Sequence, residues 1–215
     1  MIIQPPTILF AEVVDTKDPD KLGRLQVKIK GLEKDLTLPW IRVVLPYAGS
    51  EYGFDFLPEK GDEVVVLRGA GNSADAMVIL GAVHNGAKKP VKPDSDGKND
   101  VKELKTRSGH RISLTDKSGS EQVLIETGDA KLSLTLDQKG GKVTLKADKE
   151  LVLIAETKVS VQAQTVEIKG SQAITLKGDS KVTLEGQSAV EVKSSASIKL
   201  TGGMVQISGT MVEIG

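Results

Sequence analysis

The sequence predicts an all-β protein in which a small N-terminal barrel is followed by a C-terminal β-helix. Apolar and polar residues alternate with the period of two that half-buried strands require. A short apolar motif recurs ten times toward the C-terminus. All six aromatic residues precede position 57, and all eight prolines precede position 94. We therefore expect large side chains to fill a compact core in the first part, and a core too narrow for rings in the second.

The composition excludes several classes of protein. The 29 Lys and Arg residues balance 29 Asp and Glu residues, so no net charge attracts nucleic acid or an anionic membrane. There is no cysteine for a disulfide framework or a thiolate zinc site. No apolar run approaches the roughly 18 residues of a transmembrane helix, and the N-terminus lacks the pattern of a signal peptide. We expect the chain to be made and folded in the cytoplasm.

The barrel is predicted from five short strand-like stretches, at residues 8–14, 23–29, 38–45, 62–67 and 76–83. Pairs such as Val27 and Ile29, or Val64 and Val66, show the alternation of half-buried strands. Five strands in about 85 residues suit a closed barrel of the OB type, with an SH3-like barrel as the nearest alternative. We assign residues 1–88 to this domain and residues 89–105, which are rich in turn formers, to a linker.

Two binding functions of such a barrel are disfavoured. A binder of single strands needs basic strands with aromatic stacking platforms, whereas the aromatic residues at 40–56 lie among acidic ones. Gly69, Gly71 and Ala74 fit a dinucleotide-binding pattern, but residues 77–80 predict a strand where that site needs a helix. We therefore expect no nucleic-acid partner, and we interpret these glycines as a hairpin turn.

The second part consists of short repeats, each an apolar-x-apolar triplet spaced seven or eight residues from the next. A small residue stands two positions after each of the first nine triplets. Period two places the apolar and small residues on one face, and a small residue allows close approach at a corner. The predicted core comprises Val143, Leu145, Leu151, Leu153, Val159, Val161, Val166, Ile168, Ile174, Leu176, Val182, Leu184, Val190, Val192, Ile198, Leu200, Val205 and Ile207.

One repeat makes only one side of a prism, and two arrangements can close it. A single chain could use three repeats for each coil, or three chains could wind together and supply one side each. The second arrangement suits a core without rings and pairs every strand edge with a partner chain. Both arrangements remain open at this point. We assign residues 106–136 to neck strands and residues 137–215 to the β-helix.

Several motifs, taken in series, resemble the central spike of contractile injection machines, a family that includes phage baseplate spikes and the VgrG proteins of type VI secretion. The segments that carry this resemblance are Asp18-Pro19, Gly23-Arg24-Leu25, Pro39-Trp40-Ile41, Pro58-Glu59-Lys60-Gly61-Asp62, Val78-Ile79-Leu80-Gly81 and Arg107-Ser108-Gly109-His110-Arg111. The resemblance implies an N-terminal OB-fold barrel followed by a C-terminal β-helix that is intertwined in a homotrimer. It also implies assembly in the bacterial cytoplasm into a baseplate or virion, and delivery across the target cell envelope on contraction.

The resemblance further implies partners at both ends of the spike. A hub is expected on the N-terminal side, either as a separate protein or as a part truncated from this chain, with the inner tube reached indirectly. The C-terminal end has no histidine to bind a metal at the tip. A PAAR-type tip protein is expected instead, on an apolar platform that could otherwise simply close the core. This platform consists of Met204, Met211, Val212 and Ile214.

No catalysis, metal or cofactor is expected. The linker is too short for a glycosidase domain with two positioned carboxylates. His84 and His110 lie in different predicted elements, and neither has a partnered nucleophile nearby. Two other functions are weighed against the spike: a single-chain β-solenoid scaffold that polymerises, and an OB-fold nucleic-acid binder. Filaments would indicate the scaffold, salt-dependent affinity for single strands would indicate the binder, and an SDS-resistant trimer would indicate the spike.

Overall fold

The computed structural model describes residues 5–29, 36–70, 74–91 and 96–213. Its regular structure is β throughout these residues, apart from one short 3-10 turn, η1 (Ala74–Ala76), which confirms the all-β class. No helix among the described residues could span a membrane. Gly71 of the predicted hairpin and Ile214 of the predicted tip lie outside the described residues. The chain divides into two compact units, Met1–Val152 and Leu153–Gly215.

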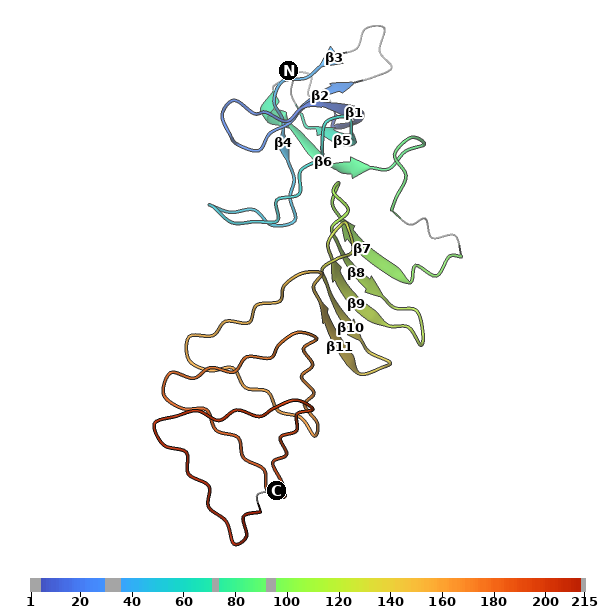
Figure 1. The fold of residues 1–215 in the computed structure, drawn as a ribbon. Helices are drawn as coiled ribbons and strands as arrows, with labels where there is room; N and C mark the ends of the chain where they lie inside the picture. The colour runs from blue at the N-terminus through green and yellow to red at the C-terminus, as the bar shows by residue number, and fades with distance from the viewer. Residues whose placement is uncertain (1–4, 30–35, 71–73, 92–95, 214–215) are drawn as a thin grey trace. The chain divides into compact units, whose positions relative to one another are not determined.

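The first sheet of unit Met1–Val152 contains six strands (Figure 1). They are β1 (Thr7–Asp15), β2 (Gln26–Ile29), β3 (Leu36–Thr37), β4 (Arg42–Val43), β5 (Glu63–Arg68) and β6 (Met77–Val83). Their order is β3-β2-β1-β5-β6-β4. Every neighbouring pair is antiparallel except β4 and β6, which run parallel. The two ends of this order, β3 and β4, are consecutive in the chain, so the sheet returns on itself.

The barrel closes through main-chain hydrogen bonds between Leu25 and Ile41. The amide of each residue donates to the carbonyl of the other at 2.9 Å. The amide of Leu38 also donates to the carbonyl of Val27, at 2.8 Å. The segment 36–43 therefore first pairs with β2 and then crosses to β6. Of the stretch predicted at residues 38–45, only Arg42–Val43 forms a regular strand, β4, because the chain changes partner between Leu38 and Ile41; β3 lies just before the predicted stretch.

The barrel core is aliphatic. Its fully buried side chains include Leu25, Ile41 and Ile79, and the complete buried cluster is Ala11, Val13, Leu25, Val27, Ile29, Leu38, Ile41, Val64, Val66, Met77 and Ile79. The expectation that large side chains fill this core is wrong, because no ring belongs to the buried cluster of described residues. Phe10 alternates with buried Ala11 on the outer side of β1, and four other aromatic residues lie on the excursion between β4 and β5.

The second sheet of this unit is an antiparallel meander of five strands, in the order β11-β10-β9-β8-β7 (Figure 1). The strands are β7 (Val101–Lys105), β8 (Arg111–Thr115), β9 (Gln122–Glu126), β10 (Ser133–Asp137) and β11 (Lys142–Lys146). β7 lies within the range 89–105 that the sequence assigns to the linker. β11 contains the first predicted triplet, in which Val143 and Leu145 pair with Leu136 and Leu134 of β10.

The chain reverses before β11 because residues 137–141 form a tight turn. The amide of Gly140 donates to Oδ1 of Asp137 at 2.9 Å, and the amide of Gly141 donates to the carbonyl of Gln138 at 3.2 Å. Gly141 has a φ of 56°, a left-handed conformation that a glycine adopts without steric cost. The turn therefore places Val143 and Leu145 in the meander, ahead of the remaining repeats.

Unit Leu153–Gly215 is an open coil of extended segments separated by bends (Figure 1). No strand pairing is formed among its described residues, and every described residue from Asp148 onward is exposed. The chain bends at or directly after each small residue of the repeats, so the bends coincide with the corners expected from the sequence. These small residues are Ala155, Ala163, Gly170, Gly178, Gly186, Ser194, Gly202 and Gly209.

Candidate functional site

The meander presents a row of aliphatic side chains that crosses all five strands. Consecutive cross-strand partners are Leu104 with Ile112, Ile112 with Ile125, Ile125 with Leu134, and Leu134 with Leu145. Directly opposite residues on neighbouring strands project to the same face of a sheet. This row therefore forms one continuous apolar strip, named the first row below.

A second row lies beside the first on the same face, two residues along each strand. It contains Leu114, Val123, Leu136 and Val143, and Lys102 ends it on β7. Much of this face is open to solvent: Ile112 is 46% exposed and Ile125 is 47% exposed. Contiguous apolar surface of this extent marks a site of interaction. We call the two rows together the apolar sheet face.

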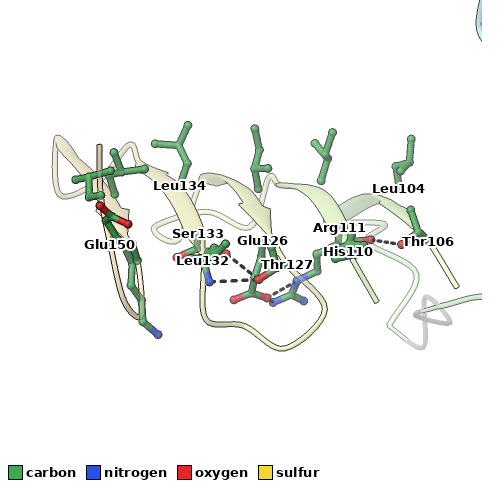
Figure 2. A pocket seen from close by; sticks show the side chains of 16 residues that line it. Leu104, Thr106, His110, Arg111, Glu126, Thr127, Leu132, Ser133, Leu134 and Glu150 are labelled. Carbon is green, nitrogen blue, oxygen red and sulfur yellow. Dashed lines mark hydrogen bonds and ion pairs between the residues drawn. The ribbon is translucent and has the colours of Figure 1, made fainter. Parts of the chain in front are cut away.

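A groove of about 530 Å³ runs along the first row and extends to Ala147 and Leu151 at the start of the repeats. Figure 2 shows Leu104 and Leu134 projecting on one side of the sheet, while Arg111 and Glu126 lie on the other. Nε of Arg111 donates to Oε2 of Glu126 at 2.9 Å. The ion pair therefore ties β8 to β9 from the polar side, and the apolar side stays free of charge along the first row.

The two histidines take different places. Nδ1 of His110 accepts a hydrogen bond from the amide of Gly128 at 3.1 Å, which holds the β7–β8 turn against the β9–β10 turn. His84 is exposed just after β6. Gly128 also packs so closely that a Cβ there would lie 2.0 Å from the carbonyl oxygen of Ser108. The Ser108-Gly109-His110 motif thus has a structural role in joining two turns.

The open coil leaves its backbone and its apolar triplets without neighbours. Within the described residues 153–213, no main-chain group hydrogen-bonds to another main-chain group. The triplet residues that the structure describes are at least half exposed, as Ile174 at 54% and Leu176 at 65% illustrate. Extended chain with unpaired amide and carbonyl groups is a template for pairing with further strands. The described part of the coil therefore offers unpaired main-chain groups and exposed apolar side chains to further strands.

The corners of the coil differ with repeat length. In the eight-residue repeats that begin at Val166, Ile174 and Val182, the corner glycines meet the carbonyl three residues later, and a Cβ at Gly186 would lie 2.3 Å from the oxygen of Ala189. In the seven-residue repeats the approach is looser: a Cβ at Gly209 would lie 3.3 Å from the oxygen of Met211. At Ser194 the side chain itself closes the corner, because its Oγ accepts from the amides of Ala196 and Ser197.

The outward residues of the coil are mostly polar, and two matching ion pairs lie on them. Glu167 pairs with Lys169 at 2.7 Å, and Glu191 pairs with Lys193 at 2.6 Å. The two pairs are three repeats apart in the sequence.

The first repeat of the coil is an exception that the sequence analysis missed, because its outward positions are Val152 and Ile154, and Ile154 is 88% exposed. Their apolar character was the available signal.

The expected tip residues are among the most exposed side chains of the coil. Met204 is 83% exposed and Met211 is 86% exposed, while Val212 is half exposed. Unbranched Met side chains adapt to irregular partner surfaces. Within the described part of the chain, no group of His, Cys, Asp and Glu residues is arranged to hold a metal ion.

The barrel carries a rigid loop before β2. The carboxylate of Asp18, whose side chain is 3% exposed, accepts hydrogen bonds from the amides of Asp20, Leu22 and Arg24 and from the Arg24 guanidinium. The Arg24 guanidinium, together with these amides, holds the pKa of Asp18 well below its usual range. The Asp18-Pro19 and Gly23-Arg24 segments of the resemblance are therefore two ends of one hydrogen-bonded loop.

The excursion between β4 and β5 displays aromatic rings at the surface. Tyr47 and Tyr52 have ring centroids 5.5 Å apart, and the rings of Phe54 and Phe56 stack with centroids 4.4 Å apart. All four side chains are exposed. Main-chain bonds from Gly49 to Tyr52 and from Phe54 to Tyr47 hold the excursion as a small hairpin. These residues are therefore surface features and contribute nothing to the buried core.

Comparison with known protein families gives one match. Residues 9–84 match the family model described as the type VI secretion system/phage-baseplate injector OB domain. No curated protein matches the chain. The match confirms the OB fold of the barrel and the resemblance of this segment to the spikes of baseplates. It supports a role in the baseplate of an injection system and an association with other baseplate components.

Proposed function

We propose that this chain is one subunit of a homotrimeric central spike of a contractile injection machine, a phage tail baseplate, a type VI system or an extracellular injection particle. In this proposal the OB barrel forms a collar, and three open coils intertwine into a triple-stranded β-helix that punctures the target envelope. The match of residues 9–84 to an injector OB domain supports a place for this chain in the baseplate of such a machine. The remaining argument rests on the coil.

The observation that carries the proposal is the unpaired backbone of residues 153–213. Unpaired amide and carbonyl groups of an extended chain are a template for further strands, and the exposed apolar triplets require a core. A single-chain solenoid would satisfy both needs by bonding each coil to the next coil of the same chain. No such bonds form among the described residues of this unit. Neighbouring chains of the same sequence would supply the missing strands.

Three copies fit the geometry of the repeat. Each repeat provides one extended side and one bend, and the matching ion pairs at Glu167 and Glu191 recur after three repeats. A prism with three sides then receives one side from each chain at every level. The apolar triplets from Val143 to Ile207 would face the common axis and form the core predicted from the sequence.

Partners at the two ends follow from the same proposal. A baseplate hub protein would sit on the N-terminal side and connect the spike indirectly to the inner tube. A PAAR-type tip protein would cap the platform formed by Met204, Met211 and Val212, together with Ile214. The spike would assemble in the bacterial cytoplasm, cross the target envelope on contraction, and work without catalysis, cofactor or nucleic acid.

The test is the mass of the purified chain by light scattering, with an unboiled SDS gel beside it. The proposal expects a discrete species of three chains that survives SDS, because unfolding the needle requires the separation of intertwined strands. A monomer would overturn the proposal. An open-ended series of filaments would replace it with the single-chain scaffold, and salt-dependent binding of single-stranded DNA would favour the nucleic-acid binder.

A further inference from the structure

We propose that the apolar sheet face is the surface on which three copies of this chain first dock, and that this docking sets their register before the coils intertwine. This inference rests on the proposed trimer and adds an order of assembly to it. It concerns β7 to β11, which lie outside the residues matched by the injector family model. Its occupant is a second copy of the same sheet.

The first argument is the difference in backbone pairing between the sheet and the coil. The ladders that join β7 to β8, β8 to β9, β9 to β10 and β10 to β11 all form within one chain. The described residues 153–213 form no main-chain bond of their own. A single chain can therefore complete the sheet alone, whereas the coil has structure to gain only after other chains are present. The sheet is the part that exists before assembly.

The second argument is what the folded sheet exposes. Its first row of Leu104, Ile112, Ile125, Leu134 and Leu145 carries no charged or polar side chain. The polar partners that a single sheet needs lie on the opposite face, where Arg111 pairs with Glu126 at 2.7 Å. Burial of the uncharged first row is most favourable against a surface that also lacks charge, and the first row of an identical sheet is such a surface.

Continuity with the coil identifies the occupant as another copy. The groove along the first row runs from Leu104 through Leu145 to Ala147 and Leu151, the latter being the first apolar residue of the next repeat. In the proposed needle, Leu151 faces the other two chains. A partner chain that covers Leu151 is therefore positioned to cover the first row as well, so that one continuous interface would extend from the coil onto the sheet.

Register is the reason that docking must come first. The repeats of the coil share one pattern of apolar-x-apolar-x-small, so a chain displaced by one repeat would still place apolar residues at the axis. Strands with weakly distinctive patterns are prone to such slips. The sheet cannot slip in this way, because its five strands are locked by ladders within each chain and end in defined turns. Three docked sheets would bring the three coils to the same starting level.

The experiment follows refolding of the full-length chain from denaturant, with light scattering for mass and unboiled gels for SDS resistance. Ile125→Lys places a charge at the centre of the first row, on the middle strand β9. Leu114→Lys places a charge in the second row, on β8. Gln122→Lys is the matched control, because Gln122 lies on β9 but projects to the opposite face. Ile174→Lys places the same charge in the coil.

We expect both sheet-face variants to form trimers at least tenfold more slowly than the unsubstituted chain, and Gln122→Lys to match it. Circular dichroism should show that the Ile125→Lys monomer keeps its β structure, since this side chain is half exposed in the single chain. Ile174→Lys should reach the mass of three chains at the normal rate and then fail to become SDS-resistant.

Two results would overturn this inference while the trimeric spike stands. One is trimer formation by Ile125→Lys and Leu114→Lys at the rate of the unsubstituted chain. The other is a delay in Ile174→Lys as large as that in the sheet-face variants, which would place the first contact in the coil. If the unsubstituted chain itself stays monomeric, the proposed function fails, and that outcome is distinguishable from both.

Discussion

Asp18 and Arg24 are joined twice through side chains and once through the backbone. Nη2 of Arg24 lies 2.6 Å from Oδ1 of Asp18, Nε lies 3.0 Å from Oδ2, and the Arg24 amide also donates to Oδ2 at 3.2 Å. A carboxylate with this many donors is stabilised in its charged form. The loop that leads into β2, and through Leu25 into the closure of the barrel, is thus held by one ionised group.

The first prediction concerns the pH dependence of this loop. The pKa of Asp18 is lowered in the folded chain, chiefly by the hydrogen bond from Arg24. A lowered folded pKa contributes stability above the unfolded value of about 4 that is lost as the pH falls through the folded value. We expect Asp18→Asn to lower the melting temperature at pH 7, and the difference from the unsubstituted chain to shrink progressively below pH 4. A pH-independent difference would contradict the assignment.

The second prediction concerns the barrel core. Ile79 is fully buried on β6, and its neighbour Leu80 is 45% exposed. We expect Ile79→Ala to cost about 2–5 kcal/mol in the free energy of unfolding, since it removes buried methyl groups and leaves a cavity. Leu80→Ala is the matched control and should cost within about 0.5 kcal/mol. Denaturant unfolding followed by Trp40 fluorescence reports on the barrel directly, and equal effects of the two changes would refute the assigned core.

The third prediction concerns the contact between the two turns of the meander. A Cβ at Gly128 would lie 2.0 Å from the Ser108 carbonyl oxygen, so the turns must separate to admit it. We expect Gly128→Ala to destabilise the meander by about 1–3 kcal/mol, the usual cost of overpacking. Hydrogen exchange of the β8 and β9 amides should accelerate. Gly86→Ala serves as the control, because a Cβ there meets nothing within 4 Å.

The fourth prediction concerns the corners of the coil. A Cβ at Gly186 would approach the Ala189 carbonyl oxygen to 2.3 Å, whereas a Cβ at Gly209 would stay 3.3 Å from that of Met211. We expect Gly186→Ala to lower the temperature at which the trimer loses SDS resistance, with the effect multiplied by three symmetric copies. Gly209→Ala should change it little. Because Ala155 and Ser194 carry side chains at other corners, a neutral Gly186→Ala would mean that the corner relaxes as those corners do.

Much of the barrel could be predicted from the sequence, because alternation along a strand reports directly on burial. Val64 and Val66, chosen for their period of two, are both fully buried on β5. Alternation reports less well on which side faces inward when an aromatic residue is present. Phe10, one of the large side chains of the first part, projects outward, whereas the residues beside it, Leu9 and Ala11, take the core side of β1.

The meander shows where local chemistry outweighs a repeat. Val143 and Leu145 match the repeat as well as any later triplet, yet Asp137, Gly140 and Gly141 supply a tight turn that returns them to β10. β7 was unmarked in the sequence because Lys102, Glu103 and Lys105 dilute its apolar pattern. How the coil is closed could not be derived from the repeats, because three repeats of one chain and one repeat from each of three chains would close the same three-sided prism.

Because the chain bends at or directly after each small residue, the length of the coil is set by the number of repeats. Each repeat consists of one extended segment and one bend, so a whole repeat can be gained or lost while the repeats on either side keep this form. In a needle of three such chains, one repeat corresponds to one strand spacing, about 4.8 Å along the axis. Duplication of one eight-residue repeat would therefore lengthen the proposed needle by one fixed increment, so that its length would change in steps of one strand spacing.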